Sequence, residues 1–339
     1  MFKSFKAIAV LSILSSCLAA GVSHAQDHPL LAAAQKEGSV TIYSALPSAF
    51  VQKVGSMFEQ KYGIKVNVFA AGGAQVEQKI ALELRAQRVA VDVLEIFDPS
   101  VINRLADQGA IAPYTPLAAK QLDPRFLDSK HRWTAATGNI YPIIYNNKQV
   151  SPQDAPKTYK DLADPKWKNK LALASPNFGA SQTIVMRGFV EQLGWDFISA
   201  LKANQPLIAR GFPDLENVVI TGERLVGPDT SSRTFVALQQ KQPISVVIPP
   251  KGVLTSVGAL GVMKQSKSPN AARLLLDYYL SDDVQGMVAE FGLFPVMAGA
   301  PSPAGFPRLD QMDLYFIDIE ELQKERSAMI DKWTTMLER

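Results

Sequence analysis

Residues 39–73 read SVTIYSALPSAFVQKVGSMFEQKYGIKVNVFAAGG, and this stretch decides the fold class of the chain. It starts with an apolar run rich in β-branched residues, continues with apolar side chains at helical spacing as far as Gly63, and ends where apolar and polar residues alternate. A helical pattern over 75–88 and a strand-like run over Val91–Phe97 follow. Strand, helix, strand, helix, strand predicts parallel strands with helices on the sheet faces, which is an α/β fold.

The same alternation returns in the middle of the chain. Strand-like runs over 140–146 and 171–176 surround a short helical segment, and the second run leads into a helical pattern over 179–194. A further strand, Pro243–Gly252, ends in a Pro-Pro-Lys-Gly turn, in which Lys251 is either a hinge residue or a cation of a cleft. Because hydrophobic cores tend to split in chains longer than about 250 residues, the sequence predicts two α/β lobes and a mostly helical tail.

The first 25 residues are typical of a secretory signal peptide. Lys3 and Lys6 precede an apolar run, and Ser23 and Ala25 stand at the small-residue positions of a cleavage site after Ala25. The apolar run is shorter than the about 20 residues that a membrane span needs. A lipoprotein signal around Cys17 is the alternative. We therefore expect an exported protein that lies in the periplasm.

Charge and cysteine content exclude further classes of function. The chain has 35 basic and 32 acidic residues. Loss of the signal peptide would remove Lys3 and Lys6 and no acidic residue, so the predicted mature chain is close to neutral. This balance gives no reason to expect nucleic acid or an anionic membrane as a partner. The one cysteine, Cys17, lies in the signal peptide, so no disulfide is expected.

The sequence also lacks the common enzyme motifs. Only His28 and His131 would remain after cleavage, and there is no Gly-x-Ser-x-Gly, His-Glu-x-x-His, Walker or Gly-x-Gly-x-x-Gly motif. Asp92 and Glu95 are three residues apart on one strand and therefore point to opposite faces, which argues against a metal site there. We expect a protein that is not an enzyme and has no cofactor or metal; an exported hydrolase without a recognisable motif is the alternative.

The candidate site lies in the loops that follow the strands, because open parallel sheets bind ligands beyond the carboxyl ends of their strands. Two of these loops carry glycine and run into helices, whose first N–H groups and positive dipole end attract anions. A third loop is rich in hydroxyl groups and ends in arginine, which suits phosphate, phosphonate or carboxylate; helix capping is its alternative role. The predicted ligand-binding residues are Tyr43, Ser44, Ala45, Gly72, Gly73, Asp98, Asn177, Gly179, Ala180, Ser181, Asp229, Thr230, Ser231, Ser232 and Arg233.

Five segments together resemble the extracellular solute-binding proteins of bacterial ABC importers. They are VTIYSA (40–45), GIKVNVFAAGGA (63–74), DVLEIFDPS (92–100), YKDLADPKWKNKLALASP (159–176) and SPNAARLLLDYYLSDDVQGMVAEFGLFPV (268–296). The resemblance is closest to the branch that holds receptors for ferric iron, phosphorylated sugars, phosphonates, thiamine and polyamines.

This resemblance implies a periplasmic binding protein fold of type II, with a ligand cleft between two lobes that close on a small-molecule solute. It places lobe one at residues 27–133 plus 251–305, lobe two at 134–250, and a helical segment that packs on the lobes at 306–339. The partner implied is an ABC permease of the inner membrane, and we expect a monomer.

The solute that the loops predict is a small anion, with ferric iron or an iron chelate as the alternative. The ferric-iron members of the family use two adjacent tyrosines, as phenolates, where this chain has Thr230–Ser232. The pair Tyr278–Tyr279 lies in an apolar helical pattern, where packing is the expected role. The segment Leu46–Pro47 also lacks the histidine or carboxylate that an iron site would need there.

Overall fold

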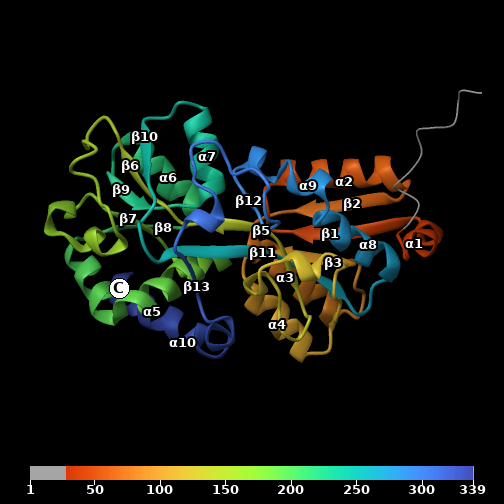
Figure 1. Cartoon of the computed structure of the whole chain (residues 1–339). Helices are drawn as coiled ribbons and strands as arrows, with labels where there is room; N and C mark the ends of the chain where they lie inside the picture. The colour runs from red at the N-terminus through yellow and green to blue at the C-terminus, as the bar shows by residue number, and fades with distance from the viewer. Residues whose placement is uncertain (1–27, 339) are drawn as a thin grey trace, which may run out of the picture.

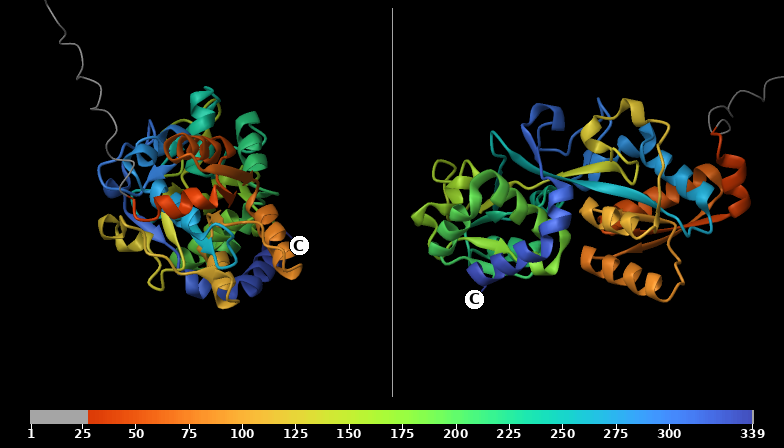
Figure 2. Two further views of the ribbon diagram at one scale, coloured as in Figure 1. Left: turned by 90° about the vertical axis from the view of Figure 1, so that its right-hand side faces the viewer. Right: turned by 90° about the horizontal axis from the view of Figure 1, so that it is seen from below.

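The computed structural model describes residues 28–338 and has two lobes side by side, joined by strands that run from one lobe into the other (Figures 1 and 2). The predicted signal peptide, residues 1–25, lies outside the described residues. Among the residues described, no helix has the length and apolar character needed to cross a membrane.

The first lobe is built on the large sheet. Its main strands, in sheet order, are β12 (Phe294–Pro295), β5 (Thr134–Ile140), β11 (Val253–Met263), β3 (Val93–Ile96), β1 (Ser39–Ser44) and β2 (Lys65–Ala70). The short strands β4 (Ile111–Ala112) and β13 (Leu314–Phe316) also pair with β11. Strand β1 is parallel to both β2 and β3, as the sequence predicted, whereas β11 is antiparallel to β3 and β5.

Helices cover the sheet of the first lobe and close its core. They are α1 (Leu31–Glu37), α2 (Ser48–Tyr62), α3 (Gly73–Arg85), α4 (Pro99–Asp107), α8 (Pro269–Tyr279) and α9 (Asp282–Gln285). Helix α2 ends because Gly63 takes the left-handed conformation, with φ of 70°. The rings of Phe50 and Tyr279 meet at 6.0 Å between centroids, and Tyr278 and Tyr279 are both buried. Packing is therefore confirmed as the role of this tyrosine pair.

The second lobe has two small sheets. The first contains β10 (Ile244–Val247), β6 (Ile143–Asn146) and β9 (Val226–Pro228), and the second pairs β7 (Ala172–Ala174) with β8 (Leu207–Ala209). Its helices are α5 (Ala180–Ala203), α6 (Phe212–Thr221) and α7 (Ser231–Gln239). This lobe has its own core, which includes Phe189 and Leu201 and also Trp333 from the C-terminal helix. Two separate cores agree with the two lobes expected from chain length.

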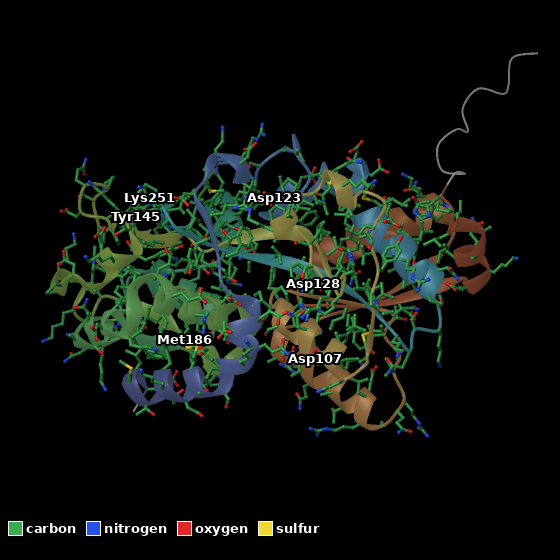
Figure 3. All side chains as sticks on the ribbon, turned by 60° about the horizontal axis from the view of Figure 1, so that its bottom comes forward. Asp107, Asp123, Asp128, Tyr145, Met186 and Lys251 are labelled. Atoms are coloured by element: carbon green, nitrogen blue, oxygen red, sulfur yellow. The ribbon has the colours of Figure 1, made fainter. Side chains whose placement is uncertain are left out.

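The chain passes between the lobes three times. It leaves the large sheet at the end of β5, returns through β11, and finally runs from β13 into α10 (Ile319–Leu337). The limits of the lobes remain a prediction, but residues 134–140 pair within the large sheet, so this part of the proposed 134–250 segment lies with the first lobe. Helix α10 lies between α4 and α5, which Asp107 and Met186 mark in Figure 3.

Candidate functional site

Three helices begin at loops that face the boundary between the lobes. Helices α3, α5 and α7 have Gly72, Gly179 and Thr230 as their N-cap residues, and none of the three has a side-chain cap. A Cβ atom on Gly73 would lie 3.9 Å from the Cβ of Ala180 and 4.0 Å from that of Ala45. The loops of the two lobes are therefore in contact, and free backbone N–H groups lie on both sides of this contact.

Behind these loops lies a group of hydroxyl and amide side chains, most of them buried, which we name the interlobe polar cluster. Its members are Thr137, Asn139, Tyr141, Ser181, Ser231 and Ser256.

Hydrogen bonds connect most of the cluster. The Tyr141 hydroxyl donates to Ser256 Oγ at 2.9 Å, and Ser231 Oγ donates to Asn139 Oδ1 at 2.9 Å. The side chains of Ser181 and Asn139 also lie near Tyr141. Burial raises the pKa of Tyr141 to about 12 although the neighbouring Ser256, Ser181 and Asn139 act to lower it. The cluster is thus a set of neutral donors and acceptors at neutral pH.

Two atoms of the interlobe polar cluster have no partner. Thr137 Oγ1 and Asn139 Nδ2 are buried and make no hydrogen bond, and both residues are at most 1% exposed. Two hydroxyl groups in or next to the candidate loops, Ser100 Oγ and Thr230 Oγ1, are also buried without a partner. A buried polar group without a partner costs about 1–3 kcal/mol. A bound water, ion or ligand is one way to supply the partner that such a group needs.

The structure uses the predicted residues of the first lobe mainly for internal bonds. Tyr43 donates to Glu83 at 2.6 Å, and Ser44 donates to Glu95 at 2.6 Å. Burial raises the pKa of Glu95 to about 7, and its second oxygen has no partner. Asp98 is buried, where it caps α4 through the N–H of Ser100 at 3.0 Å.

Asp98 also contacts a residue that the sequence did not predict for the site. Arg326 of α10 donates to Asp98 Oδ2 at 2.7 Å. No signal in the sequence connects two residues that are 228 positions apart. The carboxylate of Asp98 is thus already matched by a cation of this chain.

The predicted residues of the second lobe fall into two groups. Ser181 and Ser231 belong to the interlobe polar cluster, and Gly179, Ala180 and Thr230 lie at the starts of α5 and α7.

The remaining four have other contacts. Asn177 donates to Thr334 of α10 at 2.8 Å, and Ser232 lies beside Gly292. Arg233 donates to Glu216 at 2.9 Å, so its charge is matched within the second lobe. Burial and then the neighbouring Glu216 raise the pKa of Asp229. The structure therefore does not bring Arg233 into the interlobe polar cluster.

Sequence reasoning missed the contribution of the crossing strands. Thr137 and Asn139 of β5 are two residues apart and share one face of the strand, and Ser256 lies on β11, which pairs with β5. Polar residues at alternate positions of a fully buried strand were the available signal.

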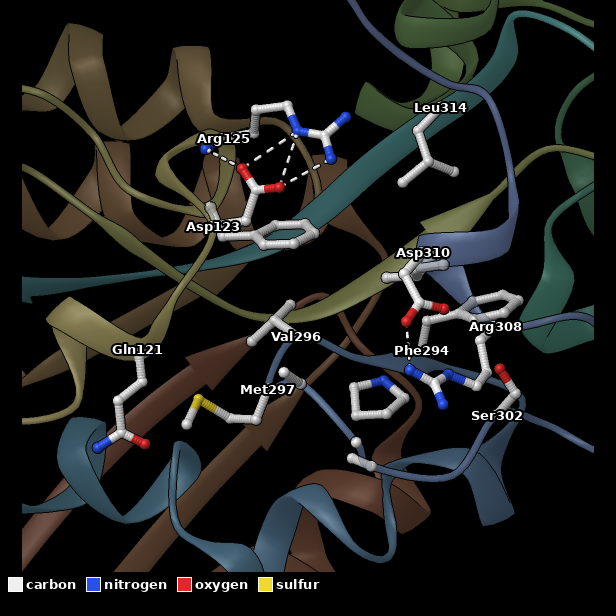
Figure 4. A pocket seen from close by; sticks show the side chains of 16 residues that line it. Gln121, Asp123, Arg125, Phe294, Val296, Met297, Ser302, Arg308, Asp310 and Leu314 are labelled. Atoms are coloured by element: carbon white, nitrogen blue, oxygen red, sulfur yellow. Dashed lines mark hydrogen bonds and ion pairs between the residues drawn. The ribbon is translucent and has the colours of Figure 1, made fainter.

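A different pocket, of about 200 Å³, lies beside the crossing strands and contains none of the predicted residues (Figure 4). Its charged side chains pair with one another: Arg125 binds Asp123, with Nη2 at 2.8 Å from Oδ2, and Arg308 binds Asp310. Because these cations are neutralised within the pocket, it offers an anion less than the interlobe polar cluster does. Among residues 28–338, no group of three or more His, Cys, Asp or Glu side chains is arranged to hold a metal ion.

The sequence of this chain matches a known family over most of its length. The matching family is described as "Bacterial extracellular solute-binding protein", and residues 89–323 match it. The chain belongs to this family. Its members bind small-molecule solutes outside the cytoplasm for ABC permeases, so the prediction of a binding protein rather than an enzyme is confirmed.

Individual relatives agree with this family and differ in their solutes. A putative 2-aminoethylphosphonate-binding periplasmic protein of Salmonella paratyphi A is 24% identical over 269 residues, which are 75% of this chain and 77% of the relative. Iron-bound HitA from Pseudomonas aeruginosa has a TM-score of 0.77 and 20% identity, with 87% of this chain and 99% of that chain covered.

The periplasmic binding protein AfuA from Actinobacillus pleuropneumoniae, with fructose-6-phosphate bound, also has a TM-score of 0.77, with 21% identity and coverage of 89% and 99%. At these identities the structural likeness shows the fold alone. It confirms the predicted periplasmic binding protein fold with two lobes.

Proposed function

We propose that this family member is the periplasmic receptor of an ABC importer and captures a small anion, with a phosphate, phosphonate or carboxylate group, between its lobes. It would act as a monomer and deliver the solute to a permease of the inner membrane. The observation that carries the proposal is the unpaired Asn139 Nδ2, buried near three helices that begin without a side-chain cap.

The unpaired groups at this place are hydrogen-bond donors, which favours an anion as the ligand. The amide nitrogen of asparagine is only a donor, so an unpaired Nδ2 needs an acceptor atom as its partner. The free N–H groups at the starts of α3, α5 and α7 are also donors, and the helix dipoles add positive potential there. An oxyanion has several acceptor oxygens and can satisfy donors from more than one of these elements.

The distribution of donors over the molecule explains why binding would favour the closed arrangement. Gly73 begins α3 in the first lobe, Ser181 and Ser231 belong to the second lobe, and Asn139 lies on a crossing strand. A ligand that contacts all of them gains its full set of bonds only while the lobes are together. Its differential affinity for this arrangement would shift the population toward it.

Ferric iron is supported less well than an anion. Hard trivalent iron requires anionic oxygen donors, but the phenol of the interlobe polar cluster, Tyr141, has a pKa raised to about 12 by burial and stays protonated. The relatives include both an iron-bound protein and a phosphonate-binding one, so they support either solute. The donor set of this chain is what favours the anion.

Isothermal titration of the purified mature chain tests the proposal, with methylphosphonate, glycerol phosphate, acetate and ferric citrate as probes. In Asn139→Asp the unpaired donor becomes an acceptor with nearly the same shape, and we expect at least tenfold weaker anion binding because a charge-assisted hydrogen bond is worth about 1.5–3 kcal/mol. Asn67→Asp makes the same change on the exposed strand β2 and should leave the affinity unchanged. Binding of ferric citrate alone, or equal anion affinity in both variants, would refute the proposal.

A further inference from the structure

A second feature of the boundary between the lobes is an apolar cavity of about 170 Å³. Segments of both lobes and of the C-terminal part form its walls. The apolar side chains that line it include Phe97, Trp133, Ile184, Val257, Phe316 and, from the start of α10, Ile319.

This cavity adjoins the interlobe polar cluster. Ser256 lines the cavity, and its Oγ accepts the hydrogen bond from the Tyr141 hydroxyl at 2.9 Å. Ile184 lies three residues after Ser181 on α5, so the two side chains are neighbours along the helix. Because Ser256 belongs to both features, one small molecule can contact the interlobe polar cluster and the apolar cavity at the same time.

The polar groups around the cavity are already satisfied. Trp133 Nε1 donates to Asn103 at 3.1 Å, and Thr255 Oγ1 donates to the carbonyl of Val253 at 2.8 Å. The guanidinium of Arg125 binds Asp123 and lies 5.2 Å from the centre of the Phe316 ring. Because most of the lining is apolar and the one charged wall residue, Arg125, is paired with Asp123, the cavity suits a hydrocarbon group.

The size of the cavity sets the size of that group. An apolar protein cavity of about 150 Å³ holds one benzene molecule. The volume here is slightly larger, so it matches one six-membered ring better than two fused rings.

We infer that the solute carries such a ring, as an aryl or cycloalkyl phosphonate or carboxylate whose anionic group binds the interlobe polar cluster while its ring fills the cavity. This inference rests on the proposed function, since the cluster must hold the anionic end. It adds the apolar half of the ligand and assigns Val257, Ile184 and Phe97 as residues that determine specificity.

A comparison of methylphosphonate with phenylphosphonate tests this inference, because the two probes share the anionic group and differ in the ring. We expect phenylphosphonate to bind the unmodified protein about 50-fold more tightly, as burial of roughly 100 Å² of apolar surface predicts. Val257→Phe fills the cavity and should reduce this preference to less than threefold while methylphosphonate binds as before. Unchanged methylphosphonate binding shows that the variant is folded.

A second variant covers the case in which the added ring disturbs β11. Phe97→Ala enlarges the cavity and should improve the binding of 1-naphthylphosphonate at least tenfold relative to phenylphosphonate. Equal affinity of the unmodified protein for methylphosphonate and phenylphosphonate overturns the inference and leaves the proposed function standing. Failure of both probes to bind overturns the two together. An equal loss of both probes in Val257→Phe, with no gain of 1-naphthylphosphonate binding in Phe97→Ala, overturns the role of the cavity.

Discussion

Substitution of Arg326 by methionine should destabilise the protein, because this arginine matches a carboxylate that has no contact with water. Asp98 is 0% exposed, and apart from Arg326 at 2.7 Å its carboxylate accepts one other hydrogen bond, from the N–H of Ser100. Arg326→Met keeps most of the apolar length of the side chain and removes its charge. Breaking a buried ion pair costs about 3–5 kcal/mol. Since the Arg326 side chain is itself 20% exposed, we expect a loss nearer about 3 kcal/mol.

The melting temperature should fall by about 5 °C. The unfolding entropy is about 2.1 cal/mol/K per residue, or about 0.65 kcal/mol/K for roughly 310 residues. Dividing the loss of about 3 kcal/mol by this entropy gives the fall of about 5 °C. Urea denaturation should give the same free energy.

Two further variants isolate the ion pair. Lys324→Met lies on the same helix and removes a pair with Glu321 in which both side chains are exposed, so it should cost less than about 0.5 kcal/mol. Asp98→Asn combined with Arg326→Met should recover about 2 kcal/mol relative to the sum of the single changes. The reasoning is refuted if Arg326→Met costs no more than Lys324→Met, or if the double variant is additive.

Three other substitutions test the fold. Burial raises the pKa of Glu95 from 4.5 to about 7, so the native state keeps a proton that the unfolded state releases. The free energy of unfolding should therefore fall by about 3 kcal/mol between about pH 4.5 and pH 8. Glu95→Gln should remove this fall in urea titrations, and a fall that persists in the variant would contradict the role of Glu95. Trp333→Ala should cost about 3–5 kcal/mol in urea denaturation, because Trp333 is 2% exposed in the core of the second lobe, and a cost below 1 kcal/mol would show that α10 is not anchored there. Gly227→Ala would bring a Cβ atom 2.6 Å from the carbonyl oxygen of Ala172 and should lower stability by about 1–3 kcal/mol. In Gly72→Ala the new Cβ atom meets no atom closer than 3.9 Å, so this control should keep its stability. Equal effects of the two changes would contradict the close approach of β7 and β9.

Local patterns were sufficient for most of the elements. The run up to Gly63 predicted a strand, a helix and its end because periodicity and a left-handed glycine act within a few residues of the chain. Strand β13 was missed within a tail expected to be helical. Its three residues show no helical or strand period of their own, and they are extended because they pair with β11.

The candidate site was predicted less completely than the fold, because much of it depends on contacts between residues far apart in the sequence. Glycine loops at the starts of helices are local features, and the sequence identified those of α3 and α5. The partner of Arg233 is Glu216, 17 residues earlier, and that of Asp98 is Arg326, 228 residues later. Which charge is free for a ligand depends on such tertiary pairs, and a single sequence does not contain them.

The contacts of α10 determine where the lobes can separate. Trp333 and Met329 of this helix are buried in the core of the second lobe, so separating α10 from that lobe would expose apolar surface. Its contacts with the first lobe include polar ones, Arg326 with Asp98 and Gln323 with Asp107 at 2.6 Å.

Polar groups regain hydrogen bonds from water when they separate, whereas apolar surface does not. The helix should therefore move with the second lobe, and opening should break its polar contacts with the first. Opening also hydrates Asp98, so the loss of Arg326 should favour the open arrangement. A solute bound to the interlobe polar cluster must then supply more of the free energy of closure, which predicts weaker solute binding in Arg326→Met although Arg326 is not a member of the cluster.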